Sequence, residues 1–324
     1  LFRQLTERTN RPQTPTQSGA YIGLANVLRE MNHLNEAEAY AVKGIQLAEQ
    51  GGIGGVVRHG CVVLAGIHKA QGDFESAHAA LAHAEAMADS LAVAHIVVQL
   101  ATHRIALEIA RGNLGMIDMW VRERDLRLDE DFDYRRELEL VTLARARIAQ
   151  GSSHEVVALL ERLRLAAQHD GRMGNVIEDC ILLAIAKHTL GETDEAVAIL
   201  KHALDLAEPQ GYVRLFVDAG KALVPLLGFI AAQGLHLNYI NTLLIALDAQ
   251  QASPIQGDVP VEDLTEREYE VLRLLALEMT NPEIAEQLYI GAGTVKTHTL
   301  NIYRKLNVRS RSEAVRRARE LQLI

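Results

Sequence analysis

The sequence predicts an all-α protein in which a solenoid of helical hairpins is followed by a small four-helix domain. Hydrophobic residues make up 48% of the chain and aromatic residues only 4%, a composition that favours helices packed on helices. At 324 residues the chain exceeds one ordinary core, so two or more domains are expected. Turn residues also recur with a regular period, which is typical of stacked helical pairs.

The period is close to forty residues and organises residues 19–210. Turn residues separated by 40, 40, 39 and 40 positions each follow the first helix of an apparent hairpin: Asn32, Gly72, Gly112, Gly151 and Gly191. Small residues and leucines keep constant offsets around most of these turns, which lets paired helices approach closely. The pattern resembles tetratricopeptide repeats with longer connections than their usual period of about 34. The third repeat is degenerate, because Arg104 stands where the others have Leu.

The remaining segments depart from this period. Residues 1–18 are expected to be a flexible N-terminal segment. Residues 211–247 are expected to form a helical cap that closes the repeats. Residues 248–263 contain two prolines and no apolar period, which predicts a linker. The four-helix domain then occupies residues 264–324.

Local signals predict where the four short helices begin. Residues 265–268 form a capping box that opens the first helix, and residues 310–313 form another that opens the fourth. Asn281 is expected to cap the second helix, with Pro282 at its first position. The third helix follows a short turn, and the whole unit has the outline of a helix-turn-helix.

The third helix has one apolar face, formed by Val295, Thr299, Ile302 and Leu306, which should pack on the first two helices. The other side would then be free to enter the major groove of DNA, where such side chains reach base edges and phosphates. The candidate DNA-binding residues are Thr294, Lys296, Thr297, His298, Leu300, Asn301, Arg304, Lys305, Arg309 and Arg311.

These candidates have different expected roles. Lys296 can bond guanine or a phosphate, and Asn301 a base or the backbone. Leu300 can touch a thymine methyl group or contribute no direct readout. His298 is either a structural hydrogen-bonding residue or a DNA contact.

Charge is divided unevenly within this small domain. The whole chain carries a net charge of −9, which argues against a uniformly basic coat. Residues 260–290 hold eight acidic and two basic side chains, whereas residues 291–324 hold eight basic and two acidic ones. Such a domain can present its positive half to phosphate, and Lys305, Arg309 and Arg311 are expected at the phosphates.

Residues 264–315 resemble the LuxR-type (GerE-like) helix-turn-helix domain, whose pattern is Leu-Thr-x-Arg-Glu, Asn-x-Glu-Ile-Ala, Thr-Val-Lys-x-His and Asn-Ile-x-x-Lys-Leu. The chain matches it at Leu264, Thr265, Arg267, Glu268, Asn281, Glu283, Ile284, Ala285, Thr294, Val295, Lys296, His298, Lys305 and Leu306. The full layout, with its repeats and the Arg214-Leu-Phe-Val-Asp218 segment, is similar to the large MalT-like, ATP-dependent LuxR regulators.

This resemblance implies a transcription regulator, which is expected in the cytoplasm. No constellation of residues supports an enzyme, and none is expected. It implies double-stranded promoter DNA as a partner, bound by a dimer, with RNA polymerase as a further partner. A small-molecule inducer or a protein would act on the repeats. The chain would be the C-terminal half of such a regulator, so no cofactor is expected in this chain, and ATP is expected only in an N-terminal module. Dimerisation through the fourth helix is expected to use Ala314, Val315, Ala318 and Leu321.

Other classes of function have less support. The alternative is a helical-repeat interaction scaffold that binds no specific DNA sequence. The chain contains neither a phosphate loop of the form Gly-x-x-x-x-Gly-Lys-Ser/Thr nor a paired zinc motif, and a metal site is not expected. Cys61 and Cys180 lie in apolar helical context, where buried free thiols are expected. No apolar stretch approaches the roughly 20 residues that cross a bilayer, so no membrane partner is expected.

Overall fold

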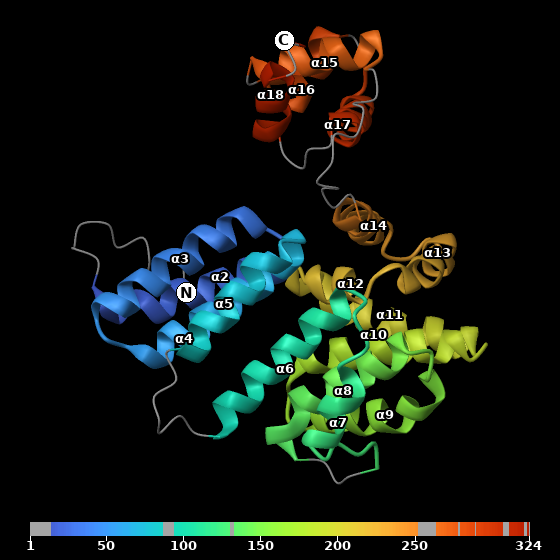
Figure 1. Ribbon diagram of the computed structural model, residues 1–324. Helices are drawn as coiled ribbons and strands as arrows, with labels where there is room; N and C mark the ends of the chain where they lie inside the picture. Colours follow the sequence, from blue (N-terminus) through green and yellow to red (C-terminus); the bar gives the residue numbers. More distant parts are fainter. Residues whose placement is uncertain are drawn as a thin grey trace. The chain divides into compact units, whose positions relative to one another are not determined.

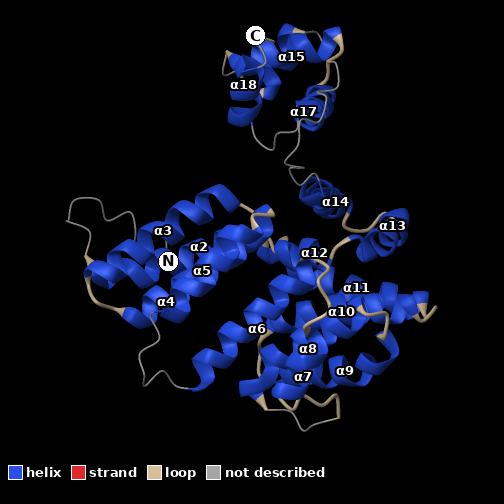
Figure 2. Cartoon of the chain, viewed as in Figure 1, coloured by secondary structure: helices blue, strands red, loops and turns tan. Residues whose placement is uncertain are grey.

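A computed structural model describes residues 14–86, 94–129, 133–251, 264–277, 279–288, 290–306, 311–320 and 323. These residues contain helices and connecting turns, with no strand among them (Figure 2). The all-α prediction is therefore confirmed. The chain divides into two compact units, a repeat unit (Leu1–Gln250) and a C-terminal unit (Gln251–Ile324), which are described separately.

The repeat unit consists of consecutive helical hairpins (Figure 1). Its helices are α2 (Ser18–Glu30) and α3 (Leu34–Gln50), α4 (Gly54–Gln71) and α5 (Phe74–Ala86), α6 (Ala94–Ala110) and α7 (Ile117–Glu123), α8 (Glu137–Ala149) and α9 (Ser153–His169), and α10 (Met173–Thr189) and α11 (Thr193–Ala207). Short 3-10 helices η1 (Pro15–Gln17), η2 (Tyr134–Arg136) and η3 (Glu208–Gln210) flank them. The predicted order of hairpins is confirmed.

All five predicted turn residues adopt the left-handed backbone conformation. Their φ angles are 65° at Asn32, 80° at Gly72, 76° at Gly112, 82° at Gly151 and 85° at Gly191. Glycine enters this region without a Cβ penalty, and asparagine is among the residues that tolerate it best. The forty-residue period therefore marks the same backbone turn in every hairpin.

Small residues allow the helices to pack closely, as predicted. Ala25, Ala144 and Ala184 are fully buried at corresponding positions of their hairpins. At two glycines the approach is closer still, because a Cβ on Gly44 or Gly60 would lie 2.6 Å from an isoleucine side chain of the first hairpins. Larger residues there would force these helices apart.

The third hairpin departs from the others, also as predicted. Its second helix, α7, has only seven residues. Arg104 forms an ion pair with Glu85 of α5 at 2.7 Å in place of an apolar contact. Trp120 of α7 is buried and packs with Ile105 and Leu143, which fills the space that a longer helix occupies elsewhere.

The cap contains α12 (Arg214–Ala219), the 3-10 helix η4 (Lys221–Leu223), α13 (Val224–Ala232) and α14 (Leu237–Gln251). Phe216, Leu227 and Leu243 are fully buried in one core with α10 and α11. Two predicted boundaries need correction. Helical structure begins at η1 and α2, inside the segment 1–18, and α14 continues into the predicted linker 248–263 because its helical hydrogen bonds run on to Gln251. Residues 252–263 lie outside the described part.

The C-terminal unit has a core of its own. Its helices are α15 (Glu266–Ala276), α16 (Asn281–Gln287), α17 (Ala292–Leu306) and α18 (Arg311–Glu320). Val271 and Leu272 of α15, Ile284 of α16, and Val295 and Ile302 of α17 are fully buried together. The predicted four-helix domain is thus present.

The two cysteines of the repeat unit lie in its interior, as predicted. Cys61 and Cys180 are free and buried, and burial raises the pKa of each thiol to about 11, so both are poor nucleophiles at neutral pH. Over the described residues, no helix is both long and apolar enough to cross a membrane.

Asp179 on α10 is a charged residue type in a fully buried position. Neither carboxylate oxygen has a hydrogen-bond partner among the described residues. Burial, with a smaller effect of Glu178 and Glu137, raises the pKa of Asp179 to about 8. The folded chain therefore keeps a proton that the unfolded chain releases above its ordinary pKa of 3.8.

This proton should make the stability of the repeat unit depend on pH. Between the two pKa values, Asp179 is expected to lower the free energy of unfolding by roughly 1.4 kcal/mol for each pH unit of increase. Asp179→Asn should remove this dependence and be more stable than the wild type at pH 8 and above. Thermal or urea unfolding from pH 5 to 9 measures this dependence. If the free energy of unfolding changed with pH in the same way for both proteins, the assignment would be contradicted.

Candidate nucleic-acid interface

The inner face of α17 fixes the rotation of this helix in the C-terminal unit. Val295 and Ile302 are fully buried, and Thr299 is nearly so. The Thr299 hydroxyl donates to the Val295 carbonyl oxygen at 2.9 Å, so its polar group needs no outside partner. The predicted inner face is confirmed for these three residues, while the Leu306 side chain lies outside the description.

The outward positions of α17 follow from this rotation, because successive residues turn by about 100°. Thr294 is exposed, and His298 and Asn301 are partly exposed. The positions of Thr297 and Arg304 lie opposite the buried face. The side chains of five candidates lie outside the description although their backbone in α17 or α18 is described: Lys296, Thr297, Leu300, Arg304 and Arg311. Arg309 lies outside the described residues altogether.

The capping box at the start of α15 is confirmed. The Thr265 amide and hydroxyl donate to Glu268 Oε2 at 2.8 and 2.9 Å, and the Glu268 amide donates to the Thr265 hydroxyl oxygen at 3.3 Å. Glu268 is almost fully buried, although its carboxylate is charged. A buried carboxylate requires a compensating charge.

Lys305, which is a predicted phosphate contact, supplies this charge within the unit. Its Nζ donates to Glu268 Oε2 at 2.8 Å, and the exposed fractions of the two side chains are only 13% and 4%. Burial raises the pKa of Glu268, but hydrogen bonds from Lys305 and Thr265 outweigh that effect and keep the pKa below its usual value. Lys305 is therefore an internal tie between α17 and α15.

Arg267 makes a second tie inside the unit. Its Nη2 donates to the Leu288 carbonyl oxygen at the end of α16 at 2.6 Å, and Nη1 pairs with Glu270. This bond satisfies one of the carbonyl groups that a helix end leaves free. The adjacent residues Arg267 and Glu268 thus join α15 to the two helices of the turn motif.

The start of α16 also differs from the prediction. The N-cap is Thr280 and not Asn281, which is the first helical residue, with Pro282 after it. The Thr280 amide and hydroxyl both donate to Glu283 Oε2 at 2.7 Å. The reciprocal bonding of a threonine and a glutamate three residues apart satisfies more amide groups than a lone asparagine cap could.

The apolar face of α18 is used within the unit. Ala314 and Ala318 are fully buried in the core that contains Val271 and Ile302. The prediction that these two alanines form a dimer surface is therefore wrong. A small domain has little apolar surface, and it buries this face in its own core. Val315 is partly buried, and Leu321 lies outside the described residues.

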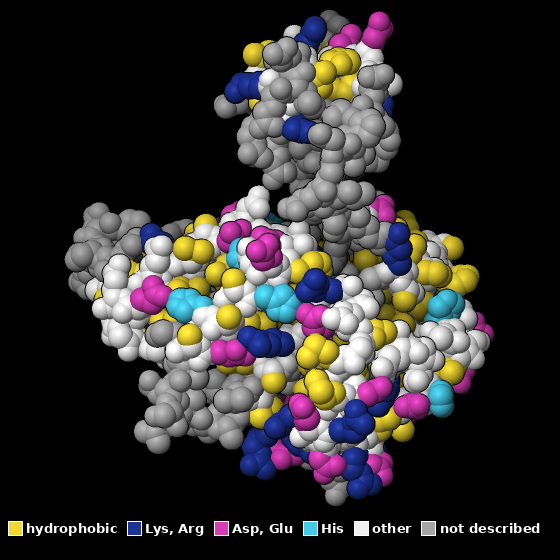
Figure 3. Space-filling view, viewed as in Figure 1, with side chains coloured by type: hydrophobic (Ala, Val, Ile, Leu, Met, Phe, Trp, Pro, Cys, Tyr) yellow, Lys and Arg dark blue, Asp and Glu magenta, His cyan; other side chains and the backbone are white. Residues whose placement is uncertain are grey.

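Arg319 is exposed and Arg317 partly exposed in the last turn of α18, and Arg273 is exposed on α15. Figure 3 shows Lys and Arg side chains on the one face of the unit that it draws. Glu266 and Glu270 are exposed on α15. The first helix therefore carries exposed charges of both signs, and further basic residues lie at the end of the last helix.

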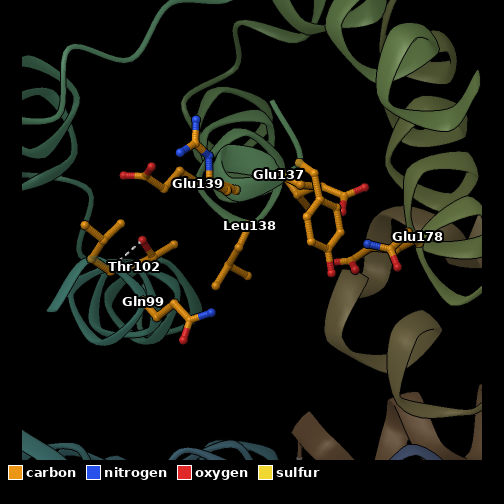
Figure 4. Close-up of a pocket in the computed structure, with 11 residues that line it drawn as sticks. Gln99, Thr102, Glu137, Leu138, Glu139 and Glu178 are labelled. Atoms are coloured by element: carbon orange, nitrogen blue, oxygen red, sulfur yellow. Dashed lines mark hydrogen bonds between the residues drawn. The ribbon is translucent and has the colours of Figure 1, made fainter. Parts of the chain in front are cut away.

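A cavity of about 240 Å³ lies in the repeat unit between α6, α8 and α10 (Figure 4). Each of its carboxylates is paired with an arginine: Glu139 with Arg124 at 2.9 Å, Glu178 with Arg145 at 2.8 Å, and Glu137 with Arg172. Gln99 and Leu138 extend into the space from two of these helices (Figure 4). The lining therefore presents amide and apolar groups to a ligand, and its charged groups are already paired.

The described part of the chain contains no group of three or more His, Cys, Asp or Glu residues placed to hold an ion. Several of the thirteen histidines make separate contacts, such as His236 with Asp205 at 3.1 Å.

The fold and the site define a class of protein: helical repeats joined to a LuxR-type helix-turn-helix. Comparison with known families agrees. Residues 3–233 match the MalT-like TPR region, and residues 262–318 match the family described as bacterial regulatory proteins, luxR family. The chain belongs to the family that carries the MalT-like TPR region, and its C-terminal unit is a LuxR-type DNA-binding domain.

Individual relatives share this layout. The chain is 27% identical over 319 residues to the HTH-type transcriptional regulator MalT of Vibrio campbellii, covering 92% of this chain and 35% of that protein. It is 26% identical over 319 residues to the protein of the same name from Vibrio parahaemolyticus, with the same coverage of both chains. The Klebsiella pneumoniae protein of that name is 29% identical over 208 residues, covering 55% of this chain and 22% of the relative. The chain spans about a third of the length of the relatives from Vibrio.

The tie between Glu268 and Lys305 can be tested by Glu268→Gln, which keeps the shape and removes the charge. We expect amide exchange in α15 and α17 to accelerate about tenfold or more, because a lysine is left buried without its anion, a loss of roughly 1–3 kcal/mol. Hydrogen–deuterium exchange followed by mass spectrometry measures this. Glu266→Gln, at an exposed position of the same helix, is the matched control. Equal effects of the two substitutions would contradict the assignment.

Proposed function

We propose that this chain acts as a DNA-binding transcription regulator in which α17 reads promoter DNA in the major groove. The observation that supports this most directly is the burial of Val295, Thr299 and Ile302, which leaves the opposite side of α17 for DNA. The relatives are named HTH-type transcriptional regulators, which supports the same role. No catalytic role is proposed for the described residues.

Nine of the ten candidate DNA-binding residues predicted from the sequence are kept in this proposal. Thr294, Lys296, Thr297, Leu300, Asn301 and Arg304 are proposed for the groove or its edges. Arg309 and Arg311 are proposed for phosphates, which supply affinity but no sequence information. Lys305 is removed from this set, because Glu268 already binds its ammonium group. His298 is proposed at the edge of the interface.

We propose that the repeat unit couples a signal to this DNA-binding unit. A small inducer or a protein could act on it, and the cavity between α6, α8 and α10 suits a small neutral ligand with hydrogen-bonding groups, since its carboxylates are already paired. An ATP-dependent step, which the resemblance implies, would belong to a separate nucleotide-binding module of the full-length protein.

We further propose that the protein binds DNA as a dimer on paired half-sites. A single small unit offers few contacts, and two-fold symmetric half-sites double them. The buried alanines of α18 are not available for this purpose. The surface that joins two copies must therefore lie elsewhere on the protein or form only on the DNA.

The competing function is an interaction scaffold that binds no specific DNA, and a salt titration separates the two. If α17 and the basic C-terminal residues bind DNA, the affinity for a promoter duplex should fall steeply with salt, with a logarithmic slope of about −0.9 for each phosphate neutralised. Fluorescence anisotropy between 50 and 300 mM salt measures the slope, with an unrelated duplex of equal length as control. A flat dependence would favour the scaffold.

A further inference from the structure

The short helix α12 connects the two ends of the repeat array. Val213, which precedes α12, donates its backbone amide to the Glu30 carbonyl oxygen at the end of α2 at 2.8 Å. Residues of α12 also contact α2 directly. These partners are more than 180 positions apart in the sequence. Figure 1 shows α12 among the first hairpins and the last ones.

Two charged residues of α12 bind the first hairpins. The Asp218 carboxylate accepts a hydrogen bond from Lys69 Nζ of α4 at 2.8 Å. Arg214, one turn earlier, pairs with Asp218 and donates from Nη1 to Asn32 Oδ1 at 3.2 Å. Asn32 is the left-handed turn residue of the first hairpin. We call these contacts of Arg214 and Asp218 with Asn32 and Lys69 the ionic seam.

The seam keeps its charges although it is largely shielded from water. Only 4% of the Arg214 side chain and 22% of the Asp218 side chain are exposed. Burial raises the pKa of Asp218, but Lys69, Arg214 and Arg29 outweigh that effect and keep the pKa far below its usual range. A further cation, Arg145 of α8, interacts electrostatically with the Asp218 carboxylate. Asp218 is therefore the anion on which several elements of the array converge.

The opposite side of α12 is apolar and binds the cap. Phe216 and Val217 are buried in the core that α10, α13 and α14 share. The Phe216 ring meets the Tyr239 ring of α14 edge to face, with centroids 5.9 Å apart. The Tyr239 hydroxyl donates to the Tyr212 carbonyl oxygen just before α12. Phe216 and Tyr239 thus tie α12 to α14, the last helix of the repeat unit.

The two sides of α12 should differ in how easily they separate. A helix of six residues is not stable alone and depends on its neighbours. Separation on the apolar side would expose Phe216 to water, whereas separation on the ionic side would expose charged groups that water solvates well. Local opening is expected where the least apolar surface is exposed. The ionic seam is therefore the weaker joint.

We propose that the ionic seam is a latch that closes the repeat array, and that its opening is the conformational change by which the array alters DNA binding. With the latch closed, Asp218 and Arg214 hold the first hairpins against the cap. With it open, α12 stays with α13 and α14 while α2 and α4 are released. The regulatory part of this inference rests on the proposed function, because only a DNA-binding protein would use the change in this way.

Hydrogen–deuterium exchange on the full chain tests the latch. Lys69→Met and Asp218→Asn should each accelerate exchange at residues 28–33 and 211–219 by roughly tenfold, while α9 stays unchanged, because the Val213 amide is released from Glu30. Lys69→Arg keeps the charge and should behave like the wild type. The matched control is Lys187→Met. Lys187 lies outside the seam, and its Nζ pairs with Glu192 at a distance of 2.7 Å. Unchanged exchange, or acceleration spread over the whole unit, would overturn the latch.

DNA affinity measured on the same variants separates this inference from the proposed function. Localised opening together with a DNA affinity changed about threefold or more supports a regulatory latch. Localised opening with wild-type DNA affinity overturns the regulatory role while DNA binding stands. If the wild type itself binds no DNA, the proposed function fails, and the exchange pattern alone then decides whether the seam opens as a unit.

Discussion

Val295 and Ile302 lie in the core of the C-terminal unit, and their burial fixes the rotation of α17 about its own axis. Every proposed DNA contact depends on this rotation, since a change of one helical position would turn other side chains outward. The Glu268–Lys305 ion pair adds a polar constraint to the apolar one, and it links α17 to the capped start of α15. The recognition surface is thus set by contacts that face away from DNA.

The repeat unit obeys a different constraint, the return of one left-handed turn every forty residues. Where the turn is Gly151 or Gly191, the following helix runs back along its partner, and small residues keep the pair close. Such arrays are held mainly by neighbouring contacts. The bonds of Arg214 and Asp218 to the first hairpins are an exception, because they join elements distant in sequence. Long-range closure of this kind gives the array a joint that can respond as a unit.

The sequence predicted those features that local rules determine. Periodic turns, the capping box of Thr265 and the inner face of α17 follow from spacing alone. Glu268, the partner of Lys305, is 37 positions away in the sequence, so local patterns do not predict this ion pair. The one local indication is that Lys305 falls on the flank of α17 and not opposite Val295, where a side chain can still reach a neighbouring helix. Burial of Ala314 likewise depends on how four helices fill one core. Long-range electrostatics and packing are what the pattern left undetermined.

We propose that the outward side of α17 meets base edges, and Lys296 lies on the flank of that side near the start of the helix. Footprinting of the full-length protein on a bound promoter, comparing Lys296→Ala with the wild type, tests this directly. Lys221→Ala, an exposed lysine of the repeat unit, is the control. We expect a loss of about 1–3 kcal/mol in specific binding for Lys296→Ala alone, with relaxed sequence preference. An unchanged footprint and affinity for that variant would contradict the assigned face.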